Sequence, residues 1–145
     1  MASSIQGIDR LFARVKKLAQ DTRQVERPLK VASVYMLGSI DKNFADEGRP
    51  QKWKALADST KAKRRGSSPK ILTDRAKLRR SHSFNLTNQG SEIGTNAVQG
   101  PRQHFGYSEG EGRGQAETPA RPFLMFQRED IREIGEIFKR SIAGK

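Results

Sequence analysis

Residues 81–95 read Ser-His-Ser-Phe-Asn-Leu-Thr-Asn-Gln-Gly-Ser-Glu-Ile-Gly-Thr, and this stretch decides the fold class of the 145-residue chain. His82, Phe84 and Leu86 alternate with small or polar side chains, which is the period of a half-buried strand. A turn signal follows at residues 89–90, and residues 91–95 then read as a returning strand with Ile93 facing inward. The stretch therefore predicts an antiparallel β-hairpin.

Helical periodicity flanks this hairpin on both sides. Apolar residues recur at three- and four-residue steps over residues 5–18, over a second helix that opens near Pro28, and over a C-terminal helix that Gly144 closes. The carboxylates at 129–130 suit the start of the last helix, where negative charge meets the helix dipole favourably. The apolar residues expected to face the core from the second and the last helix are Val31, Val34, Leu37, Ile40, Phe44, Ile131, Ile134, Ile137, Phe138 and Ile142.

The segments next to the hairpin predict shorter elements. A short basic helix is expected to be capped by Asp58 or Ser59 and to end at Gly66, and a second one carries Leu78. After the hairpin, residues 119–126 read as a strand whose two prolines place it at a sheet edge. Together these elements predict an α+β fold in one domain over residues 1–145. It has amphipathic helices at both ends, short basic helices and a small, mainly antiparallel sheet.

Residues 106–119 form a polar stretch rich in glycine. Such a stretch cannot bury enough apolar surface to hold one conformation by itself. We expect a flexible loop that becomes ordered only against a neighbour, with Glu109 and Glu111 available for that contact.

The composition limits the possible classes of protein. The chain carries a net charge of +12 and no cysteine, so disulfides and thiolate sites are excluded. Its first residues lack the apolar core of a signal peptide, and no apolar run approaches the roughly 20 residues that cross a bilayer. We expect no membrane partner, and a protein made and used in a cytoplasm or in a particle assembled there. The apolar content of 34% is lean, which indicates long polar loops or packing against other subunits.

A search for catalytic chemistry finds no consistent set of residues. The two histidines, His82 and His104, are 22 positions apart and have no motif that would supply a catalytic or metal-binding partner. The glycines of residues 106–114 fit neither a Walker loop nor a dinucleotide fingerprint. We therefore predict no catalytic residue, no cofactor and no metal site.

The basic segment, residues 61–80, is the strongest compositional signal. It holds nine cationic side chains and one carboxylate, and so carries +8 of the net +12. Three interpretations stay open: binding of acidic protein surfaces, a solvated face, and contact with duplex DNA. Aromatic side chains for stacking single strands only flank the segment. The candidate basic surface consists of Lys61, Lys63, Arg64, Arg65, Lys77, Arg79 and Arg80.

Several short motifs occur in a fixed order along the chain. Residues 44–53 hold Phe…Gly-x-Pro-x-x-Trp, residues 70–81 hold Ile-Leu…Leu-x-x-Ser, and residues 119–124 read Pro-Ala-Arg-Pro-Phe-Leu. This ordered set, which spans residues 31–142 and ends in an amphipathic helix, resembles the phage virion morphogenesis family, the tail-completion group. The chain departs from that family at Arg75-Ala76, where a glycine is usual, and at Gln103-His104, whose order is inverted.

The resemblance implies a structural virion protein without catalytic activity, located at the neck or tail end. Similar proteins form rings at the head–tail junction, so a homo-oligomeric, hexameric ring is expected, with neck, tail-tube, sheath or connector proteins as partners. Ring closure requires two different patches that meet on neighbouring subunits. The candidate contact residues are Trp53, Phe105, Glu109, Glu111, Arg121, Pro122 and Phe123.

Alternatives remain for these residues and for the function. Trp53 serves either as a core residue or as an interface anchor. Arg121 either belongs to a rigid strand entry that buries Phe123 or contacts a neighbour's carboxylate bidentately. The alternative functions are a basic DNA-binding accessory protein in packaging or DNA retention, and an assembly factor absent from the finished particle.

Overall fold

The computed structural model describes residue 13 and residues 22–66, 68–108 and 117–143. Apart from residue 13, which is helical, the expected helix over residues 5–18 lies outside the described residues, as does the expected helix end at Gly144. Most of the Gly-rich loop, including Glu109 and Glu111, also lies outside them.

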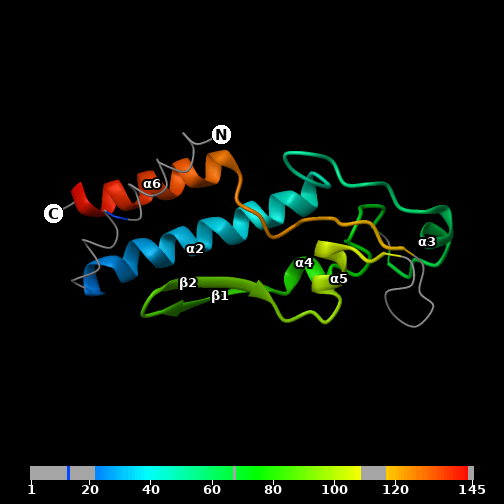
Figure 1. Cartoon of the computed structure of the whole chain (residues 1–145), viewed down its shortest axis with the longest axis horizontal. Helices are drawn as coiled ribbons and strands as arrows, with labels where there is room; N and C mark the ends of the chain where they lie inside the picture. The colour runs from blue at the N-terminus through cyan, green and yellow to red at the C-terminus, as the bar shows by residue number, and fades with distance from the viewer. Residues whose placement is uncertain (1–12, 14–21, 67, 109–116, 144–145) are drawn as a thin grey trace.

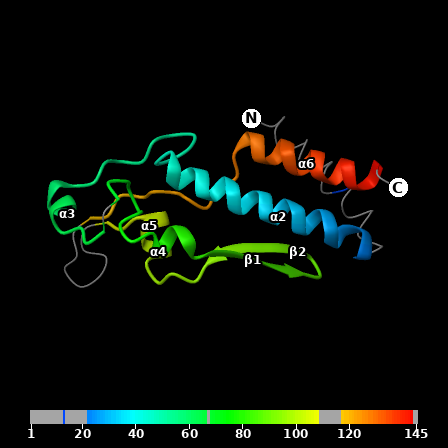
Figure 2. The same ribbon diagram turned by 180° about the vertical axis from the view of Figure 1, so that it is seen from behind.

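A long helix, α2 (Thr22–Ala45), runs through the middle of the molecule. Helix α6 (Arg128–Ala143) packs along one side of α2, and the hairpin of β1 (His82–Thr87) and β2 (Gly90–Thr95) lies along the other. The short helices gather beyond one end of the hairpin, so the molecule is elongated along α2 (Figures 1 and 2). This arrangement confirms the predicted α+β class.

The hairpin confirms the prediction from the alternating pattern. The two strands pair antiparallel, with Phe84 opposite Ile93 and Leu86 opposite Ser91. Ser83 and Asn85 are exposed, whereas the alternate side chains are partly buried against α2. The alternation of apolar and polar side chains along β1 thus determines which face of the strand packs against α2.

The predicted start and inward face of α2 are partly wrong. The helix begins at Thr22 and contains Pro28 instead of opening there. Val31 and Val34 are 49% and 56% exposed. The buried positions of α2 include the polar residues Ser39 and Asn43. Because α2 packs against both α6 and the hairpin, its buried face holds small and polar side chains that an apolar periodicity passes over.

Two apolar clusters lie on either side of α2. The larger one joins α2 to the irregular half of the chain and consists of Ile40, Phe44, Trp53, Ile71, Leu78 and Phe123. The smaller one joins α2 to α6 through Ala32, Ile137 and Phe138. Of the residues expected on the core face of α6, Ile142 is instead exposed.

A buried polar network fixes the start of α6 on α2. Asp130 is 1% exposed and accepts hydrogen bonds from Ser39 Oγ at 2.7 Å and Tyr35 Oη at 3.1 Å. Its carboxylate also accepts the N–H of Gln127 at 2.8 Å, which caps the first turn of α6. Arg49 donates to the carbonyl and the hydroxyl of Ser39, both at 2.9 Å. The carboxylates at the start of α6 therefore cap and anchor the helix.

Residues 119–126 do not form the predicted strand. Pro119 and Pro122 have no N–H to donate to a ladder, and the described residues contain a sheet of two strands only. The N–H of Arg121 instead donates to the carbonyl of Gln103 at 2.9 Å. The segment is thus an extended strap held by contacts with the preceding helix.

The two predicted short helices are present, but not with every predicted boundary, and a third short helix that was not predicted follows the hairpin. Helix α3 (Asp58–Ala62) has Ala57 at its N-cap without a side-chain cap, so the expected cap at Asp58 or Ser59 is wrong, and it ends before Gly66. Helix α4 (Lys77–Arg80) carries the buried Leu78 as expected. Helix α5 (Gly100–Phe105) starts with a proline in its first turn. In the described part of the chain, no helix has the length and apolar character needed to span a membrane.

Candidate interaction surfaces

Four of the predicted contact residues come together inside the fold. Trp53 Nε1 donates to the carbonyl of Pro122 at 3.0 Å, and its ring meets Phe44 edge-on at 5.6 Å between centroids. Phe123 is 1% exposed, and its ring also contacts Phe44, tilted by 36° with 5.3 Å between centroids. Trp53 and Phe123 therefore serve the core of the subunit, and the strap is the segment that delivers Phe123 to it.

Arg121 is 5% exposed and turned into the chain. Its Nε donates to the carbonyl of Lys54 at 3.0 Å and its Nη2 donates to the carbonyl of Ala55 at 3.3 Å. These bonds occupy the Nε–Nη2 edge of the guanidinium, which is the edge that a side-on bidentate contact with a neighbour's carboxylate would use. Burial lowers the pKa of Arg121. Among the described residues, no carboxylate lies within ion-pair distance of this side chain.

An open groove of about 670 Å³ lies beside Arg121. Residues of α3, α4 and α5 line it, and Glu117, Thr118, Pro119 and Arg121 line it as well. Its lining includes apolar side chains, among them Leu56, Leu72 and Leu78, and cations, among them Lys63 and Lys77. The groove thus combines an apolar floor with a charged rim at one end of the molecule.

Some residues of the predicted basic surface are engaged within the chain. Arg79 forms a two-point ion pair with Asp41 at 2.6 and 2.8 Å, and this hydrogen bonding lowers the pKa of Asp41. Arg64 donates to the carbonyls of Ser68 and Lys70, both at 2.6 Å. Lys61 lies 3.4 Å from Asp58.

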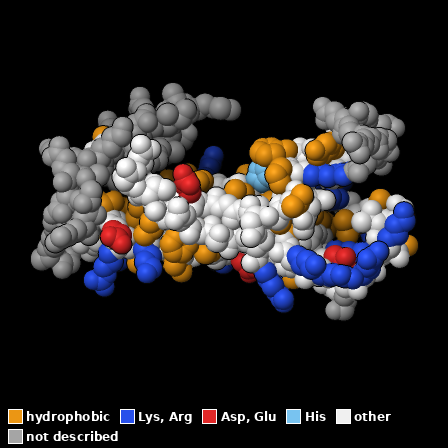
Figure 3. Space-filling view, turned by 90° about the horizontal axis from the view of Figure 1, so that it is seen from below, with side chains coloured by type: hydrophobic (Ala, Val, Ile, Leu, Met, Phe, Trp, Pro, Cys, Tyr) orange, Lys and Arg blue, Asp and Glu red, His pale blue; other side chains and the backbone are white. Residues whose placement is uncertain are grey.

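Other cations of the basic surface have no ion-pair or hydrogen-bond partner within the described ranges. They are exposed, and Figure 3 shows Lys and Arg side chains gathered most densely at the end of the molecule that carries α3. The residues in question are Lys63, Arg65, Lys77 and Arg80.

Exposed apolar side chains surround α5. Phe105 is 76% exposed at the end of the helix, and Val98, which precedes it, is 95% exposed. Tyr107 is also exposed, with the guanidinium of Arg102 5.1 Å from the centre of its ring. The sequence pattern indicated Phe105 but not Val98, because an isolated valine in a polar stretch carries no periodic signal.

The two histidines pack against aromatic rings of the core. His82 packs against both Phe44 and Phe123, and its buried Nε2 has no hydrogen-bond partner among the described residues. His104 Nδ1 lies 3.4 Å from the backbone nitrogens of Phe123 and Leu124, whose N–H groups it can accept when neutral. Burial lowers the pKa of both imidazoles. No group of three His, Cys, Asp or Glu side chains able to hold a metal ion occurs among the described residues.

The fold and its surfaces define an elongated α+β protein with a cationic end, a groove and exposed apolar side chains around α5. The chain belongs to the phage virion morphogenesis family, whose family model matches residues 4–143. The match confirms the resemblance seen in the motifs and extends it to the N-terminal residues. Comparison with curated proteins and with solved structures gave no match. The protein is therefore a phage protein of virion morphogenesis.

Proposed function

We propose that this protein is a non-enzymatic structural subunit at the head–tail junction or tail end of a tailed phage. In this role it completes the tail and joins it to neck, tail-tube, sheath or connector proteins. The family match over residues 4–143 carries the proposal, because it covers nearly all of this sequence and the family is one of virion morphogenesis.

The surfaces of the subunit support assembly into a closed ring, for which six copies are expected. A ring needs two different patches on each subunit that meet when the rotation closes. Val31 and Val34 on α2 form one exposed apolar site, and Phe105 with Val98 near α5 forms another on a different part of the molecule. Burying exposed apolar side chains at subunit contacts would also compensate for the lean core.

Sedimentation and electron microscopy test this proposal. Analytical ultracentrifugation should show a discrete oligomer at micromolar concentration, and negative-stain images should show rings at the ends of purified tails. Phage lacking the gene should yield heads and tails that do not join. A strict monomer that never decorates tails, or a deletion mutant that still makes joined, infectious particles, would contradict the proposal. Mass spectrometry of purified virions decides whether the protein stays in the particle or acts as an assembly factor.

A second candidate function, contact with duplex DNA, is favoured by the exposed cations that lack partners in the described part of the chain. These cations include Arg65 and Arg80, which are both exposed. Neutralising phosphates releases counterions, so DNA binding should weaken steeply as salt rises. A gel shift with a duplex across a salt series tests this function, and no shift even at low salt excludes it.

A further inference from the structure

Arg121 is a buried cation whose charge is not compensated within the described residues. A guanidinium that is 5% exposed has lost most of its hydration, and carbonyl dipoles replace only part of it. Its Nη1 donates to no described residue, although Nε and Nη2 are both engaged. Arg121 also lines the groove between α3, α4 and α5, and Nη1 is the nitrogen of its guanidinium that is left to donate to an incoming acceptor.

The groove around Arg121 carries more positive than negative charge. Six cationic side chains and two carboxylates line it, which leaves a net charge of +4. One of the carboxylates, Asp74, is already occupied by the backbone N–H of Gly66 at 2.6 Å. Lys63 and Lys77 lie on the rim without a partner among the described residues. An anion bound in the groove would thus meet the buried guanidinium of Arg121 and the exposed ammonium groups of Lys63 and Lys77.

Apolar side chains form part of the same groove. Leu78 is buried beneath it, while Leu56 and Leu72 are partly buried and pack against the main core. Their remaining surface would be covered by an apolar side chain of a ligand, with a gain of about 25 cal/mol per Å² buried. A ligand that fits the groove therefore carries both carboxylates and apolar groups.

We propose that this groove binds an acidic segment of a neighbouring virion protein, in which carboxylate and apolar side chains follow each other. One carboxylate meets Nη1 of Arg121 end-on, further carboxylates meet Lys63 and Lys77, and an apolar side chain rests on Leu56 and Leu72. The inference rests on the proposed structural function, since it names the chemistry of one partner contact.

Duplex DNA fits the groove less well than a peptide does. The phosphates of a duplex lie on a wide convex surface, whereas Arg121 lies almost fully buried at the back of a concavity. An apolar floor gains nothing from phosphate or sugar contacts. Among its described lining residues the groove has no aromatic ring on which a base of a single strand could stack. An extended or helical peptide, by contrast, can place single side chains into a groove of this size.

Peptide titrations with the full-length protein test the proposal. The probe is a fluorescein-labelled ten-residue peptide of alternating glutamate and leucine, followed by fluorescence anisotropy. We expect saturable binding that weakens at least tenfold in the double variant Lys63→Glu, Lys77→Glu. Peptides with glutamine in place of glutamate, or with serine in place of leucine, should each bind at least tenfold more weakly. In ¹⁵N-resolved spectra, the side-chain Nε–Hε signal of Arg121 should shift with the peptide and stay unshifted with the glutamine version.

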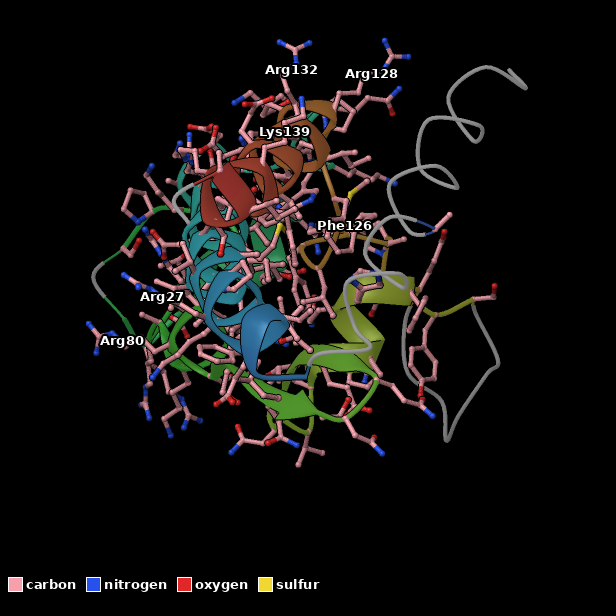
Figure 4. The ribbon with its side chains drawn as sticks, turned by 90° about the vertical axis from the view of Figure 1, so that its left-hand side faces the viewer. Arg27, Arg80, Phe126, Arg128, Arg132 and Lys139 are labelled. Carbon is pink, nitrogen blue, oxygen red and sulfur yellow. The ribbon has the colours of Figure 1, made fainter. Side chains whose placement is uncertain are left out.

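The control variant is Arg128→Glu, Arg132→Glu, which makes the same change of charge on α6. Both side chains point away from the body of the molecule (Figure 4), and neither residue lines the groove. This variant should keep its affinity for the probe within about twofold. Equal loss in both double variants, absence of binding at millimolar peptide, or tighter binding of a 20-base-pair duplex at the same residues would overturn the proposal. None of these results bears on ring formation, which sedimentation measures independently.

Discussion

The two ends of this molecule are held together in different ways. At one end, α2 and α6 lie side by side, and backbone hydrogen bonds within each helix leave the side chains free to pack. At the other end, short helices and extended segments depend on side chains that bond the backbone, as Arg121 and Trp53 do. The irregular end, which carries the groove and the basic surface, therefore takes its shape from a few contacts between residues distant in the sequence. Single substitutions should therefore separate the two ends.

The largest effect is expected at the aromatic centre that serves the irregular end. Phe123→Ala removes a ring that is 1% exposed and leaves a cavity, and should lower the free energy of unfolding by about 4 kcal/mol. Urea denaturation measures it. The matched control is Phe105→Ala, whose ring is 76% exposed and should change stability by about 0.5 kcal/mol or less. Similar losses for the two variants would contradict the burial assigned to each ring.

The next effect probes the regular end. Asp130→Ala removes the acceptor shared by Tyr35, Ser39 and the N–H of Gln127, and leaves these donors partly buried without a partner. We expect a loss of about 3 kcal/mol in the free energy of unfolding. The exposed neighbour Glu129 serves as control, and Glu129→Ala should lose less than about 1 kcal/mol. A thermal melt in which both variants match the wild type would show that the network does not anchor α6.

A smaller effect is expected at the uncompensated cation of the irregular end. Arg121→Met keeps the apolar stem but removes two hydrogen bonds to carbonyls of exposed residues, which water can replace. Because the variant also removes a buried charge without a counter-ion, the net loss should be about 1 kcal/mol. Chemical denaturation tests this value. A loss above about 3 kcal/mol would mean that the strap depends on the guanidinium much as α6 depends on Asp130.

The smallest and most gradual effect is a dependence of stability on pH. Burial lowers the pKa of His82 and of His104, so the folded chain favours the neutral imidazoles. The unfolded chain then binds more protons just below the usual pKa of about 6.5, and stability should fall as the pH drops through about 6.5. Denaturation midpoints between pH 5 and 8 measure this slope. His82→Leu should flatten part of it, and an unchanged slope in that variant would assign the effect to other groups.

Parts of both ends could be predicted from local sequence. The alternation at His82, Phe84 and Leu86 fixed the hairpin and its inward face, because a strand offers each side chain only two directions. The apolar face of α6 and its acidic first turn could also be predicted from local sequence. A single helix, α2, covers that face, so its apolar residues recur with the helical period. The motif order also indicated the family that the match over residues 4–143 confirms.

Other features depended on partners distant in the chain. The apolar pattern predicted that Val31 and Val34 face the core. Helix α2 packs against both α6 and the hairpin, however, and these contacts bury other residues of the helix. Residues 119–126 looked like a strand, yet among the described residues no neighbouring strand pairs with them, and their prolines have no N–H to donate to one.

By itself, the sequence determined the α+β class, the hairpin, the last helix and the excess of positive charge, because these follow from local periodicity and composition. Only the tertiary structure decided which side chains are buried and which cations stay free. Arg121 shows the reason, because it bonds the carbonyl of Lys54, which lies 67 positions away in the chain. A contact of that kind exists only after the chain has folded, and no local pattern records it.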